Sequence, residues 1–267
     1  MIDLTVYSLP AIFAASMFTI LIASEIGHHF GLRVAGETNV TTLEAAMLGL
    51  LALMISFTFA MALARFDSRR DALLNEANAI GTAALRARLL PAPHGAESLR
   101  LLRNYVQIRL EITKPDPTPA QMNAAIARSN EIQSALWAQV KLAVVKDNAM
   151  VPTGLYMQAL NETFDNQEKR LTALRNRVPN IVLLALYGIA IVAFGFSGYA
   201  SGTEERRWRV PVYIMSVLVA AVILLIQDID RPGAGFISVS QQPMVDTAAA
   251  LESYSAEFED TAPRRPE

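Results

Sequence analysis

The chain has 267 residues, of which 52% are hydrophobic and only 18% are charged, and its mean hydropathy is +0.29. An ordinary soluble domain has roughly a quarter of its residues charged, so this composition argues against one. The chain lacks cysteine, which excludes disulfides and thiolate metal sites, and its formal net charge of −2 gives no broad basic surface for nucleic acid.

Four apolar runs without a charged residue stand out along the chain. They cover residues 4–24, 45–64, 178–203 and 210–227. A helix needs about 20 mostly apolar residues to cross the hydrocarbon core of a membrane. A helix in a soluble protein would keep a polar face, and a strand of a membrane barrel would alternate and be half as long. We therefore predict an all-α membrane protein with four transmembrane helices, arranged as two hairpins.

The third run contains glycines at close spacing, namely Gly188, Gly195 and Gly198. Small residues allow helices to approach closely in lipid, so these positions predict a packing face. The first run is followed by a segment from Glu25 to His29 that does not resemble a small-residue cleavage site, so we expect this run to remain as a membrane helix.

A helical insert separates the two hairpins. Residues 65–177 carry 16 basic and 11 acidic residues, a net charge of +5. Apolar residues recur there at helical spacing, and Pro91, Pro115 and Pro117 interrupt the pattern. No alternating strand pattern occurs in this segment. The insert therefore predicts an antiparallel helical bundle that continues from the membrane helices.

The tail after the fourth run is acidic, with 8 acidic residues and 3 arginines in residues 228–267. A basic insert and an acidic tail on one side would attract each other, so the early tail is expected to lie on the bundle; a solvated tail is the alternative. The last five residues are expected to be disordered. The predicted segments are a first transmembrane hairpin (1–64), a soluble helical bundle (65–177), a second transmembrane hairpin (178–227) and an acidic tail (228–267).

Basic residues near the membrane predict the orientation. Four crossings place both termini and the insert on one side of the membrane. That side carries Arg65, Arg69, Arg70, Lys169, Arg170, Arg175, Arg177 and Arg231, whereas the other side carries Arg33, Arg206, Arg207 and Arg209. Because cytoplasmic loops carry an excess of Lys and Arg, we expect a multi-pass protein of the inner membrane with a cytoplasmic bundle and cytoplasmic termini.

The second run offers a candidate pore. Ile55, Phe59 and Leu63 lie one helical turn apart and form one apolar stripe, and Phe57 and Met61 belong to a neighbouring stripe. Around a symmetric oligomer such a stripe would form a hydrophobic constriction. Arg65, Arg69 and Arg70 follow it, and they would concentrate anions at a cytoplasmic mouth. From spacing alone, ordinary helix packing and membrane anchoring are the favoured explanation of the same residues.

Other chemistry is hardly indicated. The sequence has no glycine-rich phosphate loop, no metalloprotease helix motif and no nucleophile elbow, so we expect neither an enzyme nor a bound cofactor. His28 and His29, with Glu25 one turn earlier, could form a metal site. Adjacent histidines point about 100° apart on a helix, however, which favours ordinary polar residues at the membrane interface.

The second run and several later segments resemble the bacterial bestrophin-like domain family. The segments that carry the resemblance are residues 57–70, 75–83 and 89–91, Leu160 and Asn161 with Arg170, residues 177–179, the run from Asp228 through Asp230 and Arg231 to Pro232, Gly235, residues 237–240 and Pro243. Together these segments cover most of the region from Leu43 to Asp246.

The resemblance implies kinship with bestrophins, which are pentameric anion channels with two helical hairpins and a cytosolic helical insert. It implies a homo-oligomer, such as a pentamer, that passes small anions. The neck would be formed by Ile55, Phe59 and Leu63, or by the stripe through Phe57 and Met61. Animal bestrophins bind calcium after the fourth span. Only Asp228 and Asp230 stand there in this chain, and calcium takes six to eight oxygen ligands, so no calcium site is predicted.

The resemblance has one departure and leaves one alternative. The family usually has Phe after Arg-Pro, whereas this chain has Gly233. The alternative to a channel is a membrane-anchored scaffold whose cytoplasmic bundle recruits a protein partner.

Overall fold

The computed structural model describes residues 7–33, 40–112, 118–146, 148, 150–203, 209–233 and 235–260. Within these ranges the regular structure is helical and no strand occurs. Four helices are long and apolar enough to cross a membrane, which confirms the all-α membrane fold. The elements in chain order are α1 (Leu9–Gly31), α2 (Thr41–Ala87), α3 (His94–Glu111), α4 (Pro119–Lys146), η2 (Met150–Gly154), α5 (Leu155–Arg175), α6 (Asn180–Thr203), α7 (Val210–Asp230) and α8 (Gln242–Asp260).

The chain forms two compact units. The first, called here the transmembrane unit, comprises Met1–Phe66 and Asn176–Ser238. The second, the bundle unit, comprises Asp67–Arg175 and Val239–Glu267. The continuous helix α2 contributes its first part to the transmembrane unit and its last part to the bundle unit.

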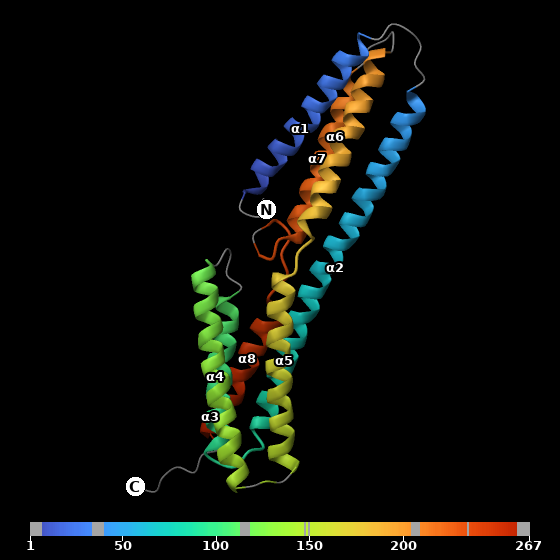
Figure 1. The fold of residues 1–267 in the computed structure, drawn as a ribbon. Helices are drawn as coiled ribbons and strands as arrows, with labels where there is room; N and C mark the ends of the chain where they lie inside the picture. The colour runs from blue at the N-terminus through green and yellow to red at the C-terminus, as the bar shows by residue number, and fades with distance from the viewer. Residues whose placement is uncertain are drawn as a thin grey trace. The chain divides into compact units, whose positions relative to one another are not determined.

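In the transmembrane unit, α1 packs along α6 and more lightly along α7 (Figure 1). The two helices α1 and α6 run parallel, since Ser16 meets Tyr187 near their beginnings and Gly31 meets Gly202 near their ends. A Cβ at Gly27 or Gly198 would overlap the backbone of the facing helix. Close backbone approach through small residues therefore holds this helix pair together.

Of the glycines that the sequence suggested for packing, Gly195 and Gly198 lie at the α1–α6 contact. Gly188 is exposed and meets no atom of this chain within 4 Å of the position its Cβ would take, so it is not part of the α1–α6 contact.

Gly198→Val is expected to destabilise the transmembrane unit by about 1–3 kcal/mol, because the new side chain would overlap the Ser24 carbonyl and force α1 away from α6. Gly188→Val is the matched control in the same helix. The yield of monodisperse protein after detergent extraction and its apparent melting temperature measure the effect. Equal values for the two variants would contradict the assigned contact.

A hydrogen-bond chain links three helices of this unit. The Ser16 hydroxyl donates to the Ile12 carbonyl at 2.7 Å, and Gln227 Nε2 donates to the Tyr187 hydroxyl at 2.7 Å. Because the one Ser16 proton is already used, the Tyr187 hydroxyl donates in the 2.9 Å contact between them. These hydrogen bonds satisfy polar groups of α1, α6 and the last turn of α7, which an apolar surrounding demands.

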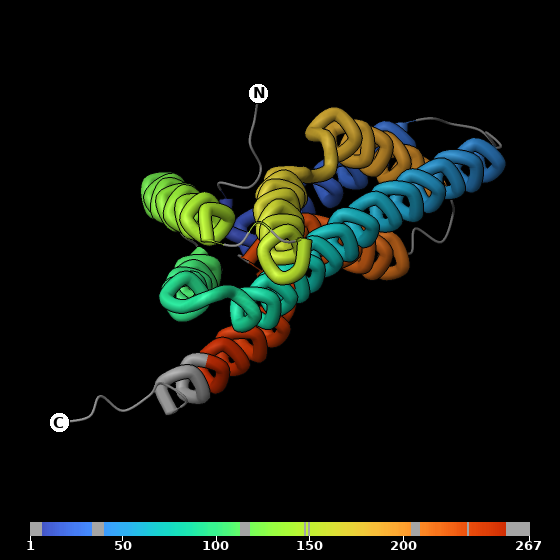
Figure 2. Tube along the Cα trace, turned by 90° about the horizontal axis from the view of Figure 1, so that it is seen from below, coloured from blue at the N-terminus to red at the C-terminus, as the bar shows by residue number. Residues whose placement is uncertain are grey.

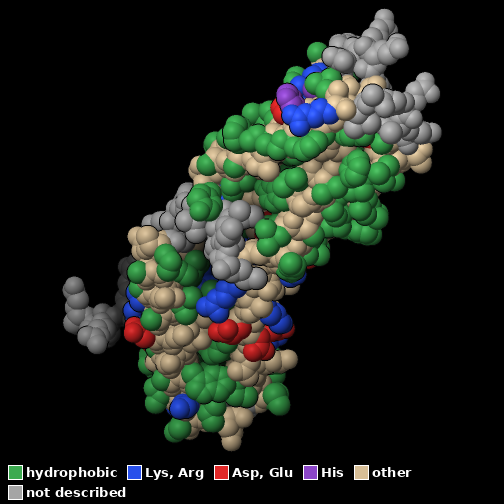
Figure 3. All heavy atoms as spheres, turned by 45° about the horizontal axis from the view of Figure 1, so that its top comes forward, with side chains coloured by type: hydrophobic (Ala, Val, Ile, Leu, Met, Phe, Trp, Pro, Cys, Tyr) green, Lys and Arg blue, Asp and Glu red, His purple; other side chains and the backbone are tan. Residues whose placement is uncertain are grey.

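The outside of the transmembrane unit is apolar. Large side chains that a soluble protein would bury are exposed on all four of its long helices, including Phe18, Phe57, Ile181 and Leu218. Figure 3 shows hydrophobic side chains over the helices of this unit, with basic and histidine side chains gathered at one end. A contiguous apolar exterior of this kind fits a lipid surrounding.

The bundle unit has its own core, built from the last part of α2 with α3, α4, α5 and α8; Figure 2 shows α3 beside α4. Side chains that pack in it include Leu73, Ile80, Leu102, Tyr105, Val106, Leu136, Val140, Tyr156 and Leu160. Helical spacing predicted most of these contacts. Leu85 and Val144 share this spacing, but both are exposed.

Helix α8 is absent from the sequence-based interpretation of the tail. It packs on α3, and Met244 and Leu251 are fully buried in the bundle core. This part of the tail does lie on the bundle, and an apolar face that includes Met244 and Leu251 packs there. The residues after 260 lie outside the described ranges.

Candidate functional site

Helix α2 presents one side outward from the transmembrane unit. Leu53 is 51% exposed and Phe57 is 61% exposed, whereas Thr58 and Ala62 are fully buried. Ser56 is exposed on the same side, and its hydroxyl donates to the Ala52 carbonyl within the helix. The outward side therefore combines two large apolar side chains with small and hydroxyl residues.

The residues of the two predicted pore stripes lie on different sides of α2. Ile55, Phe59 and Met61 are half-buried and pack against the core of their own unit. Phe57 and Leu63 are exposed, the latter at 42%. A straight helix rotates a spacing of four residues by about 40° per step, so the stripe from Ile55 to Leu63 runs from the buried side toward the exposed side.

The basic residues after the span are not equally accessible. Arg65 is half-buried, Arg69 is 3% exposed and has an interaction partner, and Arg70 is exposed. Asp67 and Asp71 are exposed next to them. At the start of the bundle part of α2, one exposed arginine therefore stands between two exposed aspartates.

The turn after the fourth membrane helix is organised by carboxylates. Asp228 accepts hydrogen bonds from the backbone N–H groups of Phe236 at 2.8 Å and Ile237 at 3.0 Å. Asp230 accepts two contacts from the Val178 N–H, at 3.0 and 3.1 Å, just before α6 begins. Both carboxylates thus fix backbone segments at the two ends of this turn.

Several residues after α7 are suited to the backbone conformation of this turn. Arg231 Nη2 donates to the Tyr7 carbonyl at 2.7 Å, and Pro232 follows in the bend. Gly233 has φ = 94°, a conformation that suits glycine, so a Phe there would be strained. A Cβ at Gly235 would overlap the Asp228 carboxylate.

A buried charge cluster in the bundle unit joins helices α2, α3 and α5. Arg109 Nε donates to Glu76 Oε1 at 2.6 Å, and Arg170 Nη1 donates to Glu76 Oε2 at 2.6 Å. The side chains of Glu76 and Arg109 have no exposed surface, and that of Arg170 is 3% exposed. One carboxylate therefore compensates two guanidinium groups in the bundle interior.

Uncharged partners complete this cluster. The Tyr105 hydroxyl donates to Gln167 Oε1 at 2.5 Å, and Arg170 Nη2 donates to Gln241 Oε1 at 3.1 Å. Burial, followed by the nearby Glu76 carboxylate, raises the pKa of the Tyr105 hydroxyl, which keeps it a donor. The sequence marked Glu76 and Arg170 only through the family pattern; their meeting with Arg109 required the fold.

The histidine pair at the end of α1 does not converge on one point. His28 is buried, whereas His29 is exposed. Glu25 accepts hydrogen bonds from Arg209 and Tyr213. Within the described ranges no group of three His, Asp or Glu residues is placed to hold a metal ion.

Comparison with known proteins adds a family and a fold. A sequence model of the bestrophin-like domain matches residues 12–244, and no curated protein matches the chain significantly. The fold is similar to that of a bacterial bestrophin homologue from Klebsiella pneumoniae, with a TM-score of 0.68 and 14% identity over 96% of this chain and 100% of that chain. A variant of the same homologue has a TM-score of 0.66 and 15% identity over 98% and 100% of the two chains. At such identities the likeness shows the fold alone.

Proposed function

Since the chain belongs to the bestrophin-like domain family, we propose that it is a homo-oligomeric ion channel of the inner membrane, with α2 lining the pore and no enzymatic activity. The observation that carries the proposal is the outward side of α2. In a ring of identical subunits, side chains that do not pack within their own subunit are available to face a central axis.

The exposures favour Phe57 as the neck. Among the predicted stripe residues it is the most exposed, and Leu53 lies one turn before it on the same side. Ile55 and Phe59 already pack against their own core, so facing a pore would remove those contacts. A ring of Phe57 side chains would form a hydrophobic constriction that conducts only when it is wetted.

The proposed ions are small anions, which the family resemblance implies. Arg70 is the exposed basic residue that would attract them at the cytoplasmic mouth, while Asp67 and Asp71 would oppose this attraction. The reversal potential in a KCl gradient tests this part separately. A potential near that of chloride supports anion conduction, and a potential near that of potassium rejects it while leaving the channel intact.

The channel proposal is tested by counting subunits and measuring flux on one sample. Purified full-length protein in detergent is expected to form a symmetric ring, such as a pentamer, and to release ions from liposomes after reconstitution. Monomers or dimers without flux would contradict the proposal. Proteolysis of the bundle unit in right-side-out and inside-out vesicles tests its cytoplasmic location.

A scaffold remains the second candidate because the bundle unit exposes apolar side chains near the junction of α4 and α5. Val145 is 86% exposed, Met150 is 75% exposed and Val151 is 60% exposed. Such residues are suited to contact a protein partner. If the protein lacks flux, loss of a co-purifying partner in Val145→Asp would support this role.

A further inference from the structure

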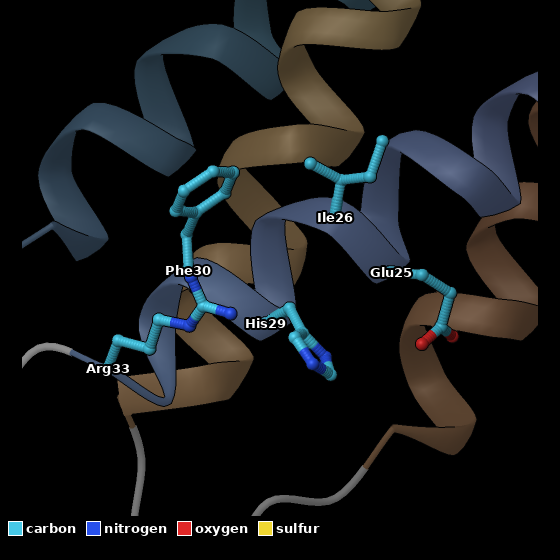
Figure 4. Close-up of a pocket in the computed structure, with 5 residues that line it drawn as sticks. All are labelled: Glu25, Ile26, His29, Phe30 and Arg33. Atoms are coloured by element: carbon cyan, nitrogen blue, oxygen red, sulfur yellow. The ribbon is translucent and has the colours of Figure 1, made fainter.

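A cavity of about 330 Å³ lies at the end of α1, in the transmembrane unit. Glu25, Ile26, His29, Phe30 and Arg33 line it (Figure 4). The spacing of four residues divides them into two adjacent rows along the helix, a polar row of Glu25, His29 and Arg33 and an apolar row of Ile26 and Phe30. The cavity is therefore amphipathic, with one polar and one apolar side.

The acidic member of the polar row is already compensated. Glu25 Oε2 accepts from Arg209 Nη1 at 2.5 Å, and Glu25 Oε1 accepts from the Tyr213 hydroxyl at 2.7 Å. The Arg209 guanidinium also lies over the Tyr213 ring, 5.1 Å from its centroid. Both oxygens of Glu25 are thus engaged by α7 and its N-cap residue, so Glu25 adds little uncompensated negative charge to the cavity.

The two basic members are not compensated in this way. Within the described part of the chain, the side chains of His29 and Arg33 make no hydrogen bond or ion pair. In Figure 4 the Arg33 guanidinium lies between Phe30 and His29. A guanidinium can bind two phosphate oxygens at once, and an imidazole N–H can donate to a third.

The apolar row extends the site toward lipid. Ile26 is 53% exposed and Phe30 is 58% exposed. Because α1 is a transmembrane helix, its last two turns lie where acyl chains meet headgroups. A ligand with one negative charge joined to a hydrocarbon chain would match both rows at once.

We propose that this cavity binds an anionic phospholipid. Arg33 pairs with the phosphate, His29 donates a further hydrogen bond to it, and Ile26 and Phe30 pack against the adjoining acyl chain. A free phosphate ion would leave the apolar row uncovered. A zwitterionic lipid would bring a cationic group to a site whose carboxylate is already paired. Free phosphate and zwitterionic lipids are therefore expected to bind more weakly than an anionic phospholipid.

Full-length protein, stripped of lipid in detergent, is titrated with phosphatidylglycerol or phosphatidylcholine, and bound lipid is counted by native mass spectrometry. Phosphatidylglycerol is expected to bind more tightly than phosphatidylcholine, and Arg33→Gln is expected to weaken it about ten-fold. Arg103→Gln is the matched control, because Arg103 is an exposed arginine of the bundle unit. The measurement does not depend on ion conduction.

Three results would overturn the proposal. Equal affinities of the wild-type protein for the two lipids would reduce the site to general membrane contact. In a parallel titration of the wild-type protein, binding of inorganic phosphate as tight as that of phosphatidylglycerol would make it a simple anion site. Unchanged lipid affinity in monodisperse Arg33→Gln protein would show that the lipid binds elsewhere. The comparisons with phosphatidylcholine and with phosphate use the wild-type protein alone, so they do not depend on whether the variant folds.

Discussion

Replacing Phe57 with alanine is expected to raise the single-channel conductance of the reconstituted protein by at least about two-fold. The ring is 61% exposed on the outward side of α2, so its removal widens the proposed constriction and makes it easier to wet. Bilayer recordings at fixed salt measure the change. Liposome flux on the same sample reports whether the total number of active channels has altered.

Phe59→Ala is the matched control for this prediction. Both residues are phenylalanines of the same helix, but Phe59 packs against the core of the transmembrane unit. Its loss should lower the apparent melting temperature and leave conductance nearly unchanged, since the pore side of α2 is not altered. The opposite pattern, with higher conductance for Phe59→Ala than for Phe57→Ala, would place the neck on the stripe of Ile55, Phe59 and Leu63.

The second large effect is expected in the bundle unit. Glu76→Gln removes the one carboxylate that compensates Arg109 and Arg170, while the shape of the side chain is kept. Breaking a buried ion pair from one side leaves an uncompensated charge in the interior, at a cost of about 3–5 kcal/mol. The apparent melting temperature of the full-length protein should fall markedly, and less monodisperse protein should be recovered.

Glu97→Gln separates burial from charge in this experiment. Glu97 pairs with Arg100 on the surface of the same bundle, at 2.5 Å. Pairs of this exposure are worth less than about 1 kcal/mol, so the melting temperature should hardly change. A loss of stability in Glu76→Gln no larger than that in Glu97→Gln would mean that the cluster is not important for the stability of the bundle.

The tail shows where reasoning from local pattern fell short. Residues 242–260 are mostly small or polar. Their apolar side chains, such as Met244 and Leu251, are too few to predict a helix that packs on the bundle. Both are nevertheless fully buried, because the bundle supplies the other walls of their site. Net charge predicted that the early tail lies on the bundle, but it did not predict the apolar contacts that α8 makes there.

The four membrane helices and the helical insert were determined by the sequence itself, because long apolar runs and helical spacing are properties of a continuous segment. The family was recognisable for the same reason, since its motifs are short stretches of chain. Which face of a helix points outward, by contrast, depends on what packs against the other faces. The fold alone therefore separated Phe57 from Phe59, brought Glu76 to Arg109 and Arg170, and turned Asp228 and Asp230 toward backbone N–H groups.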